Sequence, residues 1–290
     1  MPWQLTILLQ NVFASVYAIE SRRLASKYEK AHFQILAATF MMVYAVFIGY
    51  ALLNINLINF SISEAQALTL LGVSLAFTVW TVLTFITYRF VDASVGTLLS
   101  ALNIAAVVVI SSLFLLESLK LLQLAGASLL LLSIVVIAFA KETKKRHKNL
   151  LIALLLSMPA SICFGFAIAG EKHLLNQLGT PTYAFVGIGM QLLWLVILAM
   201  FYRRDQFKHF KDRIFRKRVM IMGSVRAGAG LLFVLALVGA NNASLIGVLS
   251  GLKIILTAIL GAILLKEVMF IKRKLLAAVI ASIGVGLLLW

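Results

Sequence analysis

The sequence predicts an all-α integral membrane protein, in which ten transmembrane helices form two inverted five-helix repeats. Three observations lead to this fold class. Of the 290 residues, 62% are hydrophobic and only 12% are charged, and the mean hydropathy is +1.05. Ten apolar segments are each long enough to cross a bilayer, and the last two match two earlier ones at a constant offset. A water-soluble fold is excluded, because so many apolar side chains cannot be buried in a core of this size.

The ten expected spans follow from segment length. A spanning helix needs about 20 mainly apolar residues, because the hydrocarbon layer is roughly 30 Å thick and each helical residue rises about 1.5 Å. The first span is expected to be retained and not cleaved as a signal peptide, because no basic residue precedes it. Only the eighth and ninth spans contain charged residues in their interiors, which are Arg226 and Lys253. The expected spans are 2–20, 31–53, 65–88, 93–116, 121–140, 149–170, 181–202, 219–239, 243–265 and 270–289.

Local signals predict where several of these helices begin or bend. The segment from Ser61 to Glu64 has the spacing of a capping box before the third span. Thr180 before Pro181 places a cap residue ahead of a proline at the first helical position of the seventh span. Pro159, inside the sixth span, removes one backbone hydrogen bond and predicts a kink, which is either a passive bend or a hinge.

The basic residues predict the orientation of the chain in the membrane. The net charge is +16, which in a soluble protein would suggest a nucleic-acid partner. Here the connections after the odd-numbered spans contain 22 of the 26 Lys and Arg residues, if Lys272, Arg273 and Lys274 at the start of the tenth span are counted with the connection before them, and such connections stay on the cytoplasmic side. We therefore expect a multi-pass protein of the plasma or inner membrane with both termini extracytoplasmic. Its surroundings are the lipid bilayer, and no nucleic acid is expected as a partner.

An internal repeat predicts the relation between the two halves. An offset of 150 residues aligns 93–140 with 243–290 without a gap, and it matches Ser100 with Ser250 and Glu117 with Glu267. Because each half has an odd number of spans, the second half would enter the membrane from the opposite side. We expect one repeat over 1–148 and the other over 149–290. Inverted repeats are typical of carriers with a substrate site near the midplane.

The residues of this repeat resemble a known family. Asp92-Ala93-Ser94 through Glu117 with Gly126, and Asn242-Ala243-Ser244 through Glu267 with Gly284, are similar to the paired modules of the drug/metabolite transporter superfamily, in particular its ten-span EamA-type members. The resemblance implies a two-module permease that moves small metabolites or drugs, often as efflux, through a cavity between the halves. The family usually places both termini in the cytoplasm, whereas the charge distribution here predicts the reverse.

Two basic residues inside the spans are the main candidates for substrate binding. A Lys or Arg at the bilayer centre costs about 2.5–3.5 kcal/mol on insertion scales, so each requires a reason to be there. Lys253 lies about ten residues into the ninth span, and its repeat counterpart is Asn103, so we expect this pair to flank a shared central cavity. Arg226 is expected at a shallower depth, where it either binds the ligand or extends to the cytoplasmic interface.

The charge of the expected site leaves several interpretations open. Glu117, Glu171 and Glu267 are expected at span ends, and only Glu20 is expected within reach of Arg226. Two cations without a carboxylate at the same depth favour an anionic group on the substrate, such as a carboxylate, phosphate or sulfonate. Alternatively, burial keeps Lys253 neutral, so that it couples transport to protons or donates a hydrogen bond to Asn103. A role in packing alone is a third interpretation.

Other polar and aromatic residues are candidates for lining the cavity. Asn11, Tyr17, Gln191, Trp80 and Trp194 offer hydrogen bonds and stacking faces to an organic ligand, although each also suits ordinary packing or an interfacial belt.

The sequence therefore predicts a gradient-driven secondary transporter of a small organic solute, anionic or zwitterionic. The four histidines lack metal-ligand spacing, and the chain has no phosphate-binding glycine motif and no catalytic constellation. We expect no enzymatic activity, no metal and no cofactor, while a proton is the candidate coupling ion. One chain carries both halves of a cavity and can act as a monomer. The alternatives are a flippase for a lipid-linked head group and a membrane scaffold that transports nothing.

Overall fold

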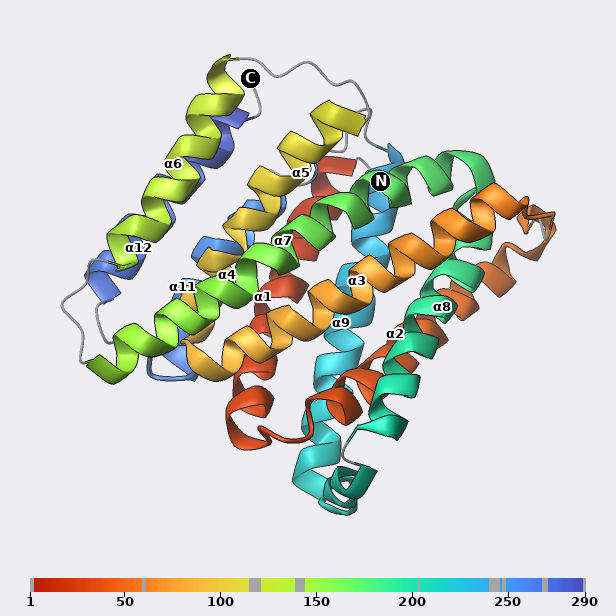
Figure 1. The fold of residues 1–290 in the computed structure, drawn as a ribbon, viewed down its shortest axis with the longest axis horizontal. Coiled ribbons are helices and arrows are strands. Elements are labelled where there is room, and N and C mark those ends of the chain that lie inside the picture. Colours follow the sequence, from red (N-terminus) through yellow and green to blue (C-terminus); the bar gives the residue numbers. More distant parts are fainter. Residues whose placement is uncertain are drawn as a thin grey trace.

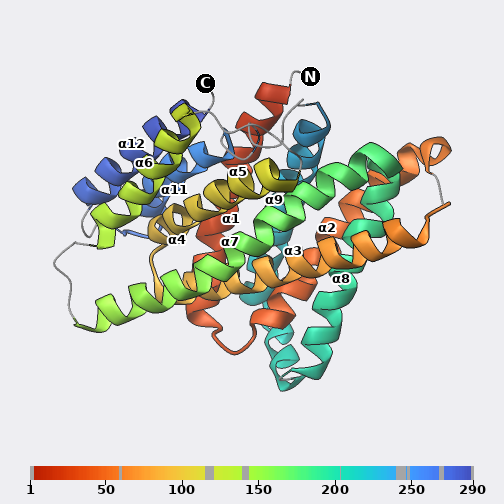
Figure 2. The ribbon, with the colours of Figure 1, turned by 45° about the horizontal axis from the view of Figure 1, so that its top comes forward.

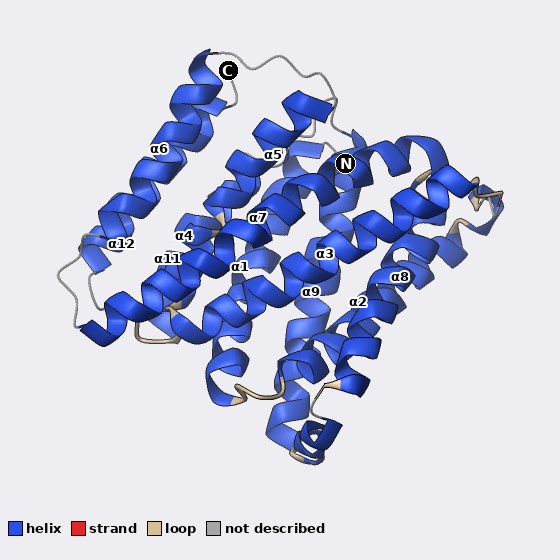
Figure 3. Ribbon diagram, viewed as in Figure 1, coloured by secondary structure: helices blue, strands red, loops and turns tan. Residues whose placement is uncertain are grey.

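A computed structural model of the chain describes residues 3–58, 61–114, 121–138, 144–202, 204–239, 246, 249–267 and 271–288. Every regular element in these ranges is a helix (Figure 3). In chain order they are α1 (Trp3–Lys27), α2 (His32–Leu53), η1 (Ile55–Leu57), α3 (Glu64–Phe90), α4 (Ala93–Leu99), α5 (Ala101–Phe114), α6 (Leu121–Ala138), α7 (Lys144–Leu178), α8 (Thr180–Phe201), η2 (Arg204–Lys211), α9 (Arg213–Gly239), η3 (Ser250–Leu252), α11 (Lys253–Leu264) and α12 (Ile271–Leu288). Glu117, Asn242, Ala243 and Ser244, all singled out in the repeat, lie outside the described residues.

Five of these helices have the length and apolar composition of membrane spans. They are α2, α3, α7, α8 and α9, with α7 considered from Lys148. The chain is thus a multi-pass membrane protein as far as its described helices show, while the number of ten spans stays a prediction. On α7, the apolar residues Leu155, Met158, Ile162 and Phe166 are all exposed and recur every three or four positions, so they form one outward face suited to lipid.

The helix starts differ slightly from those predicted. The capping box of α3 is formed by Ser63 and Gln66, whose side chains bond each other's backbone N–H groups, and the predicted pair Ser61 and Glu64 is wrong. At α8, Gly179 is the N-cap residue, with a φ of 76° that suits glycine, and Thr180 is already helical. The helix α7 continues through Pro159 from end to end.

Two predicted spans are interrupted at positions that correspond in the repeat. The segment expected as one helix over 93–116 consists of α4 and α5, which are separated at Ser100. In the ninth span, the short 3₁₀-helix η3 covers Ser250–Leu252 and α11 begins at Lys253. The hydroxyl of Ser100 donates to the carbonyl of Thr97 (2.6 Å), so it occupies a backbone acceptor beside the interruption. Broken helices of this kind commonly border substrate sites in transporters.

The helix packing is the same when the two halves are exchanged. The helix α1 packs on α9 as α7 packs on α3, α1 packs on α11 as α7 packs on α5, and α2 packs on α9 as α8 packs on α3. The pairs α2 with α8 and α6 with α12 map onto themselves. A two-repeat architecture accounts for this pattern. The predicted boundary between residues 148 and 149 falls inside α7, and its position stays a prediction.

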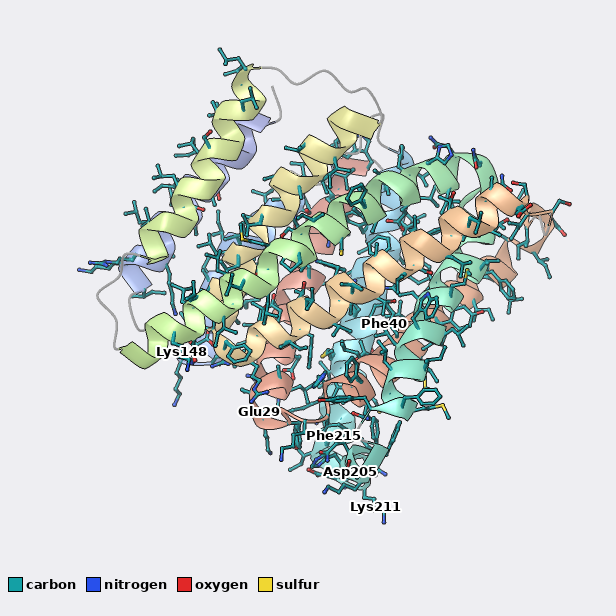
Figure 4. The ribbon with its side chains drawn as sticks, in the orientation of Figure 1. Glu29, Phe40, Lys148, Asp205, Lys211 and Phe215 are labelled. Carbon is teal, nitrogen blue, oxygen red and sulfur yellow. The ribbon has the colours of Figure 1, made fainter. Side chains whose placement is uncertain are left out.

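The main hydrophobic core lies among α1, α2, α3, α7, α8 and α9, and α6 with α12 forms a peripheral pair (Figure 1). The start of α1 and the end of α12 lie toward the same end of the bundle in both ribbon views (Figure 2). The turn after α1 and the basic segment η2 lie at the other end, where Glu29, Asp205, Lys211 and Phe215 are found together (Figure 4). This end is called the basic end below.

Candidate functional site

A cavity of about 110 Å³ lies between the two halves. Helices α1, α2, α3, α4 and α5 border it from one half, and α7, α8, α9, η3 and α11 border it from the other. A single water needs about 10–15 Å³ on this scale, so the cavity has room for several waters or a small solute. Its wall is mainly apolar and aromatic with a few polar groups, which is the usual composition of a small-molecule site.

Lys253 lines this cavity at the first position of α11. Within the described ranges its ammonium group has no hydrogen bond and no salt bridge, whereas its backbone carbonyl accepts a hydrogen bond from the hydroxyl of Ser15 (3.2 Å). Asn103, the repeat counterpart, lines the same cavity near the start of α5. Its side-chain oxygen accepts a hydrogen bond from Ser161 (2.7 Å), and it makes none with Lys253. The structure thus brings the predicted pair to one cavity, without a hydrogen bond between their side chains.

Arg226 lies close to the middle of α9, because this helix begins at Arg213 and not at 219. Its depth in the membrane stays a prediction. Its guanidinium faces three aromatic rings on three helices, with centroid distances of 5.2 Å to Tyr17, 5.7 Å to Phe40 and 5.2 Å to Trp80. These are cation–π contacts, which compensate a desolvated guanidinium without neutralising it. Arg226 lines the cavity, and within the described part of the chain it has no salt bridge.

The cavity contains a carboxyl group that the sequence interpretation placed elsewhere. Glu171 was expected at a span end, but α7 continues to Leu178, and Glu171 lines the cavity with only 3% of its surface exposed. The hydroxyl of Tyr183 on α8 and the guanidinium of Arg226 both act electrostatically on its carboxyl group. The expectation of cations without an acid at their depth is therefore wrong. The run from Glu171 to Leu178 contains no helix breaker before Gly179, and this signal could have revealed the longer helix.

The remaining candidates divide into two groups. Tyr17, Trp80 and Gln191 line the cavity, and Gln191 donates a hydrogen bond to Thr81 (3.4 Å). Asn11 and Trp194 are outside its lining. Asn11 donates to the carbonyl of Leu249 (2.9 Å), and Trp194 donates to the hydroxyl of Ser74 (3.1 Å).

Two cavity groups offer unused hydrogen-bonding capacity. The side-chain oxygen of Gln10, a residue that the sequence interpretation did not include, is buried and has no hydrogen-bond partner among the described residues. The indole N–H of Trp80 is likewise buried without a partner in that part of the chain. A buried polar group without a partner costs about 1–3 kcal/mol, so a bound solute or water that pairs with either group would recover part of this.

Polar contacts join the two halves at the basic end. The carboxylate of Glu267, just after α11, accepts the backbone N–H of Ala93 at the start of α4 through both oxygens (3.1 and 3.0 Å), and it faces Arg22 (3.7 Å). Lys274 donates to Asp92 (2.8 Å). Burial and the nearby Asp92 raise the pKa of Glu267, although Ala93, Lys274 and Arg22 oppose the shift.

Glu20 also belongs to the basic end and not to the cavity. It pairs with Arg23 on its own helix and with Arg218 on α9 (3.1 Å). The expected reach from Glu20 to Arg226 is therefore wrong, because the carboxylate is already held by two other guanidinium groups. Together with the contacts of Glu267 and Lys274, these pairs close the interface between the halves at the basic end. No group of His, Cys, Asp and Glu residues suited to a metal is found among the described residues.

Comparison with known proteins adds two findings. The sequence profile of the EamA-like transporter family matches residues 1–139 and again residues 151–290. A solved structure, described only as "Crystal structure of protein", superposes with a TM-score of 0.63 at 14% sequence identity, and the match covers 97% of this chain and 94% of the other. At this identity the likeness shows the fold alone. No curated protein matches the sequence.

Proposed function

We propose a function from one premise: this chain belongs to the EamA-like transporter family, whose profile matches both of its halves. A protein of this family is a membrane transporter of small molecules. For this chain we propose a gradient-driven carrier of a small organic solute that bears at least one anionic group, either an anion or a zwitterion. The solute would bind in the cavity between the halves.

The observation that carries this proposal is the state of the two cations in the cavity. The ammonium of Lys253 and the guanidinium of Arg226 come from different helices, line one hollow and lack an ion-pair partner among the described residues. Both residues are half-buried, and a charge that is partly removed from water without a partner is costly, so an anion that enters the cavity would supply a partner. The surrounding rings of Tyr17, Phe40 and Trp80 would shield the complex from water and offer stacking surfaces to an organic group.

Alternating access accounts for the closed basic end. The contacts of Glu267, Lys274 and Glu20 all cross from one half to the other, so opening the cavity at the basic end would require breaking them. The interruptions at Ser100 and at Ser250–Leu252 give both halves a bend beside the cavity. We propose that the halves tilt about these bends, with ten spans in an inverted arrangement and both termini extracytoplasmic. The hollow between the halves disfavours the scaffold alternative, which needs closely packed halves.

The test is transport by the purified protein in liposomes. A panel of carboxylates, phosphates, sulfonates and zwitterions is first screened for thermal stabilisation of the wild type, because a ligand of the folded state raises its apparent stability. A solute found in this way is then radiolabelled for uptake measurements. Lys253→Ala should reduce uptake to the level of empty liposomes, because the cation that holds the anionic group is lost.

The matched control is Lys208→Ala, which removes a lysine from η2 at the basic end and leaves the cavity unchanged. This variant should transport like the wild type. Normal transport by the Lys253→Ala variant would refute the proposed site, and flux of a fluorescent lipid without any flux of soluble solutes would favour the flippase alternative.

A further inference from the structure

The proposed function makes use of the two cavity cations and leaves Glu171 without a role. This residue is the acid of the cavity among the described lining residues, and almost none of its surface is exposed. Burying an isolated carboxylate costs free energy, because burial favours its neutral form unless other charges compensate it. Either neighbouring groups stabilise the charged form of Glu171, or its carboxyl group binds a proton.

The groups around Glu171 come from several helices. Tyr183 on α8 and Arg226 on α9 act on it electrostatically, but the described structure contains no salt bridge to it. The cavity also presents Lys253 from α11, Tyr17 from α1 and Tyr88 from α3. The described residues of α4 and α5, which also contact α7, carry no titratable side chain.

The neighbours of Glu171 on its own helix are directed elsewhere. Lys172 donates to the carbonyl of Leu237 near the end of α9 (2.6 Å), and His173 is exposed and pairs with Gln177 (3.0 Å). The charge of the cavity wall is therefore set by three side chains. With Glu171 ionised the described wall carries a net charge of +1, and with Glu171 protonated the net charge is +2.

We propose that Glu171 is a proton-binding site of this carrier, and that a proton on Glu171 and an anion at Lys253 and Arg226 bind cooperatively. Arg226 is the link, because it lines the same cavity as Glu171 and Lys253 and acts electrostatically on both. An anion bound there lowers the positive potential around the carboxylate, so the carboxylate accepts a proton more readily. By reciprocity, the proton raises the affinity for the anion by the same factor. The inference rests on the proposed anion site and assigns the coupled proton to Glu171, not to Lys253.

The test uses benzenesulfonate, an aromatic anion whose charge stays constant over the range of the measurement. Its affinity for the purified full-length protein is measured from thermal stabilisation between about pH 5 and about pH 8. This range includes carboxyl groups whose pKa differs from the ordinary value. The wild type should bind more tightly as the pH falls, by up to about tenfold per pH unit, which is the limit for one linked proton. In lightly buffered solution it should also take up protons when the anion is added.

Variants of Glu171 test the linked proton separately from the anion site. Glu171→Gln imitates the protonated state, so it should bind benzenesulfonate with an affinity that hardly varies with pH and without proton uptake. Glu171→Asp should restore both signals. The matched control is Glu64→Gln at the first position of α3, an exposed carboxyl outside the cavity lining, which should behave like the wild type.

Each outcome has a distinct meaning. If Lys253→Ala abolishes binding but Glu171→Gln keeps the pH dependence and the proton uptake of the wild type, the anion site stands and the role of Glu171 is overturned. If benzenesulfonate stabilises the Lys253→Ala variant as well as the wild type, the anion site itself is overturned. If it stabilises no protein at any pH, both the site for this class of anion and the linked proton fail together.

Discussion

At the scale of single residues, the cavity is defined by three ionisable groups that are compensated in different ways. Arg226 is held against aromatic rings, Glu171 against a tyrosine hydroxyl, and the ammonium of Lys253 has no partner in the described part of the chain. The sequence identified both cations because a basic residue in an apolar span is conspicuous. Glu171 escaped notice because its depth depends on where α7 ends, and hydropathy locates such ends only to within a few residues.

Glu267 carries a prediction about pH. Its raised pKa means that the folded protein holds this proton more tightly than the unfolded chain does. The stability that this group contributes is fully present below the unfolded value, which lies near 4.5, and is lost as the pH rises through the folded value. In Glu267→Gln, the unfolding temperature should fall less than that of the wild type when the pH is raised from about 4.5 to neutrality.

Thermal unfolding of the purified protein in detergent at several pH values measures this difference. Glu64→Gln, at an exposed carboxyl at the start of α3, is the control and should follow the wild-type curve. A variant Glu267→Gln whose unfolding temperature falls as steeply as that of the wild type would show that the buried carboxyl does not titrate as its surroundings require.

At the scale of helices, close approach at glycine decides how α5 and α7 pack. A Cβ added at Gly165 would lie 2.6 Å from the end of the Ile110 side chain and 3.0 Å from the carbonyl oxygen of Ala106, which is backbone and cannot easily give way. Small residues allow this kind of contact between membrane helices. The predicted span over 93–116 did not anticipate the interruption at Ser100, because neither Gly nor Pro marks it in the sequence.

Alanine at two helical glycines tests the contact between α5 and α7. Gly165→Ala should lower the free energy of unfolding by about 1–3 kcal/mol, the usual cost of overpacking. At Gly72 on α3 an added Cβ meets nothing within 4 Å, so Gly72→Ala should be neutral or stabilise by up to about 1 kcal/mol through helix propensity. Reversible unfolding in mixed micelles provides the measurement. Equal effects at the two positions would contradict the close approach of α5 to α7.

At the scale of the whole molecule, the apolar segments and the repeat were predictable because each rests on many residues. The free energy of membrane insertion is a sum over about 20 residues, so a segment is still recognised when one of its boundaries is misplaced. The site depends on individual positions, and a shift of one helix start places Arg226 in the middle of α9. The joining of Glu267 to Ala93 could not be foreseen, because it depends on how the halves meet at the basic end.

The orientation of the chain is tested by labelling from outside the cell. In a background with Cys163→Ser, the variant Ser61→Cys places a thiol between α2 and α3, and Lys208→Cys places one on η2. If the basic connections are cytoplasmic, a maleimide that cannot cross membranes should label position 61 in intact cells and position 208 only after permeabilisation. The opposite pattern would reverse the orientation, and equal labelling of both would contradict the count of spans between them.

The enclosure of Arg226 by aromatic rings, and not by a carboxylate, has a consequence for the ionic medium. Among the described residues Glu171 acts on this guanidinium electrostatically but forms no salt bridge with it, so under the proposed function an arriving anion would not have to break an ion pair at Arg226. The competitors for this guanidinium are then the anions of the surrounding salt. Under the proposed function, chloride and similar small inorganic ions should compete with the cargo, and the halide content of the buffer should then affect the transport rate.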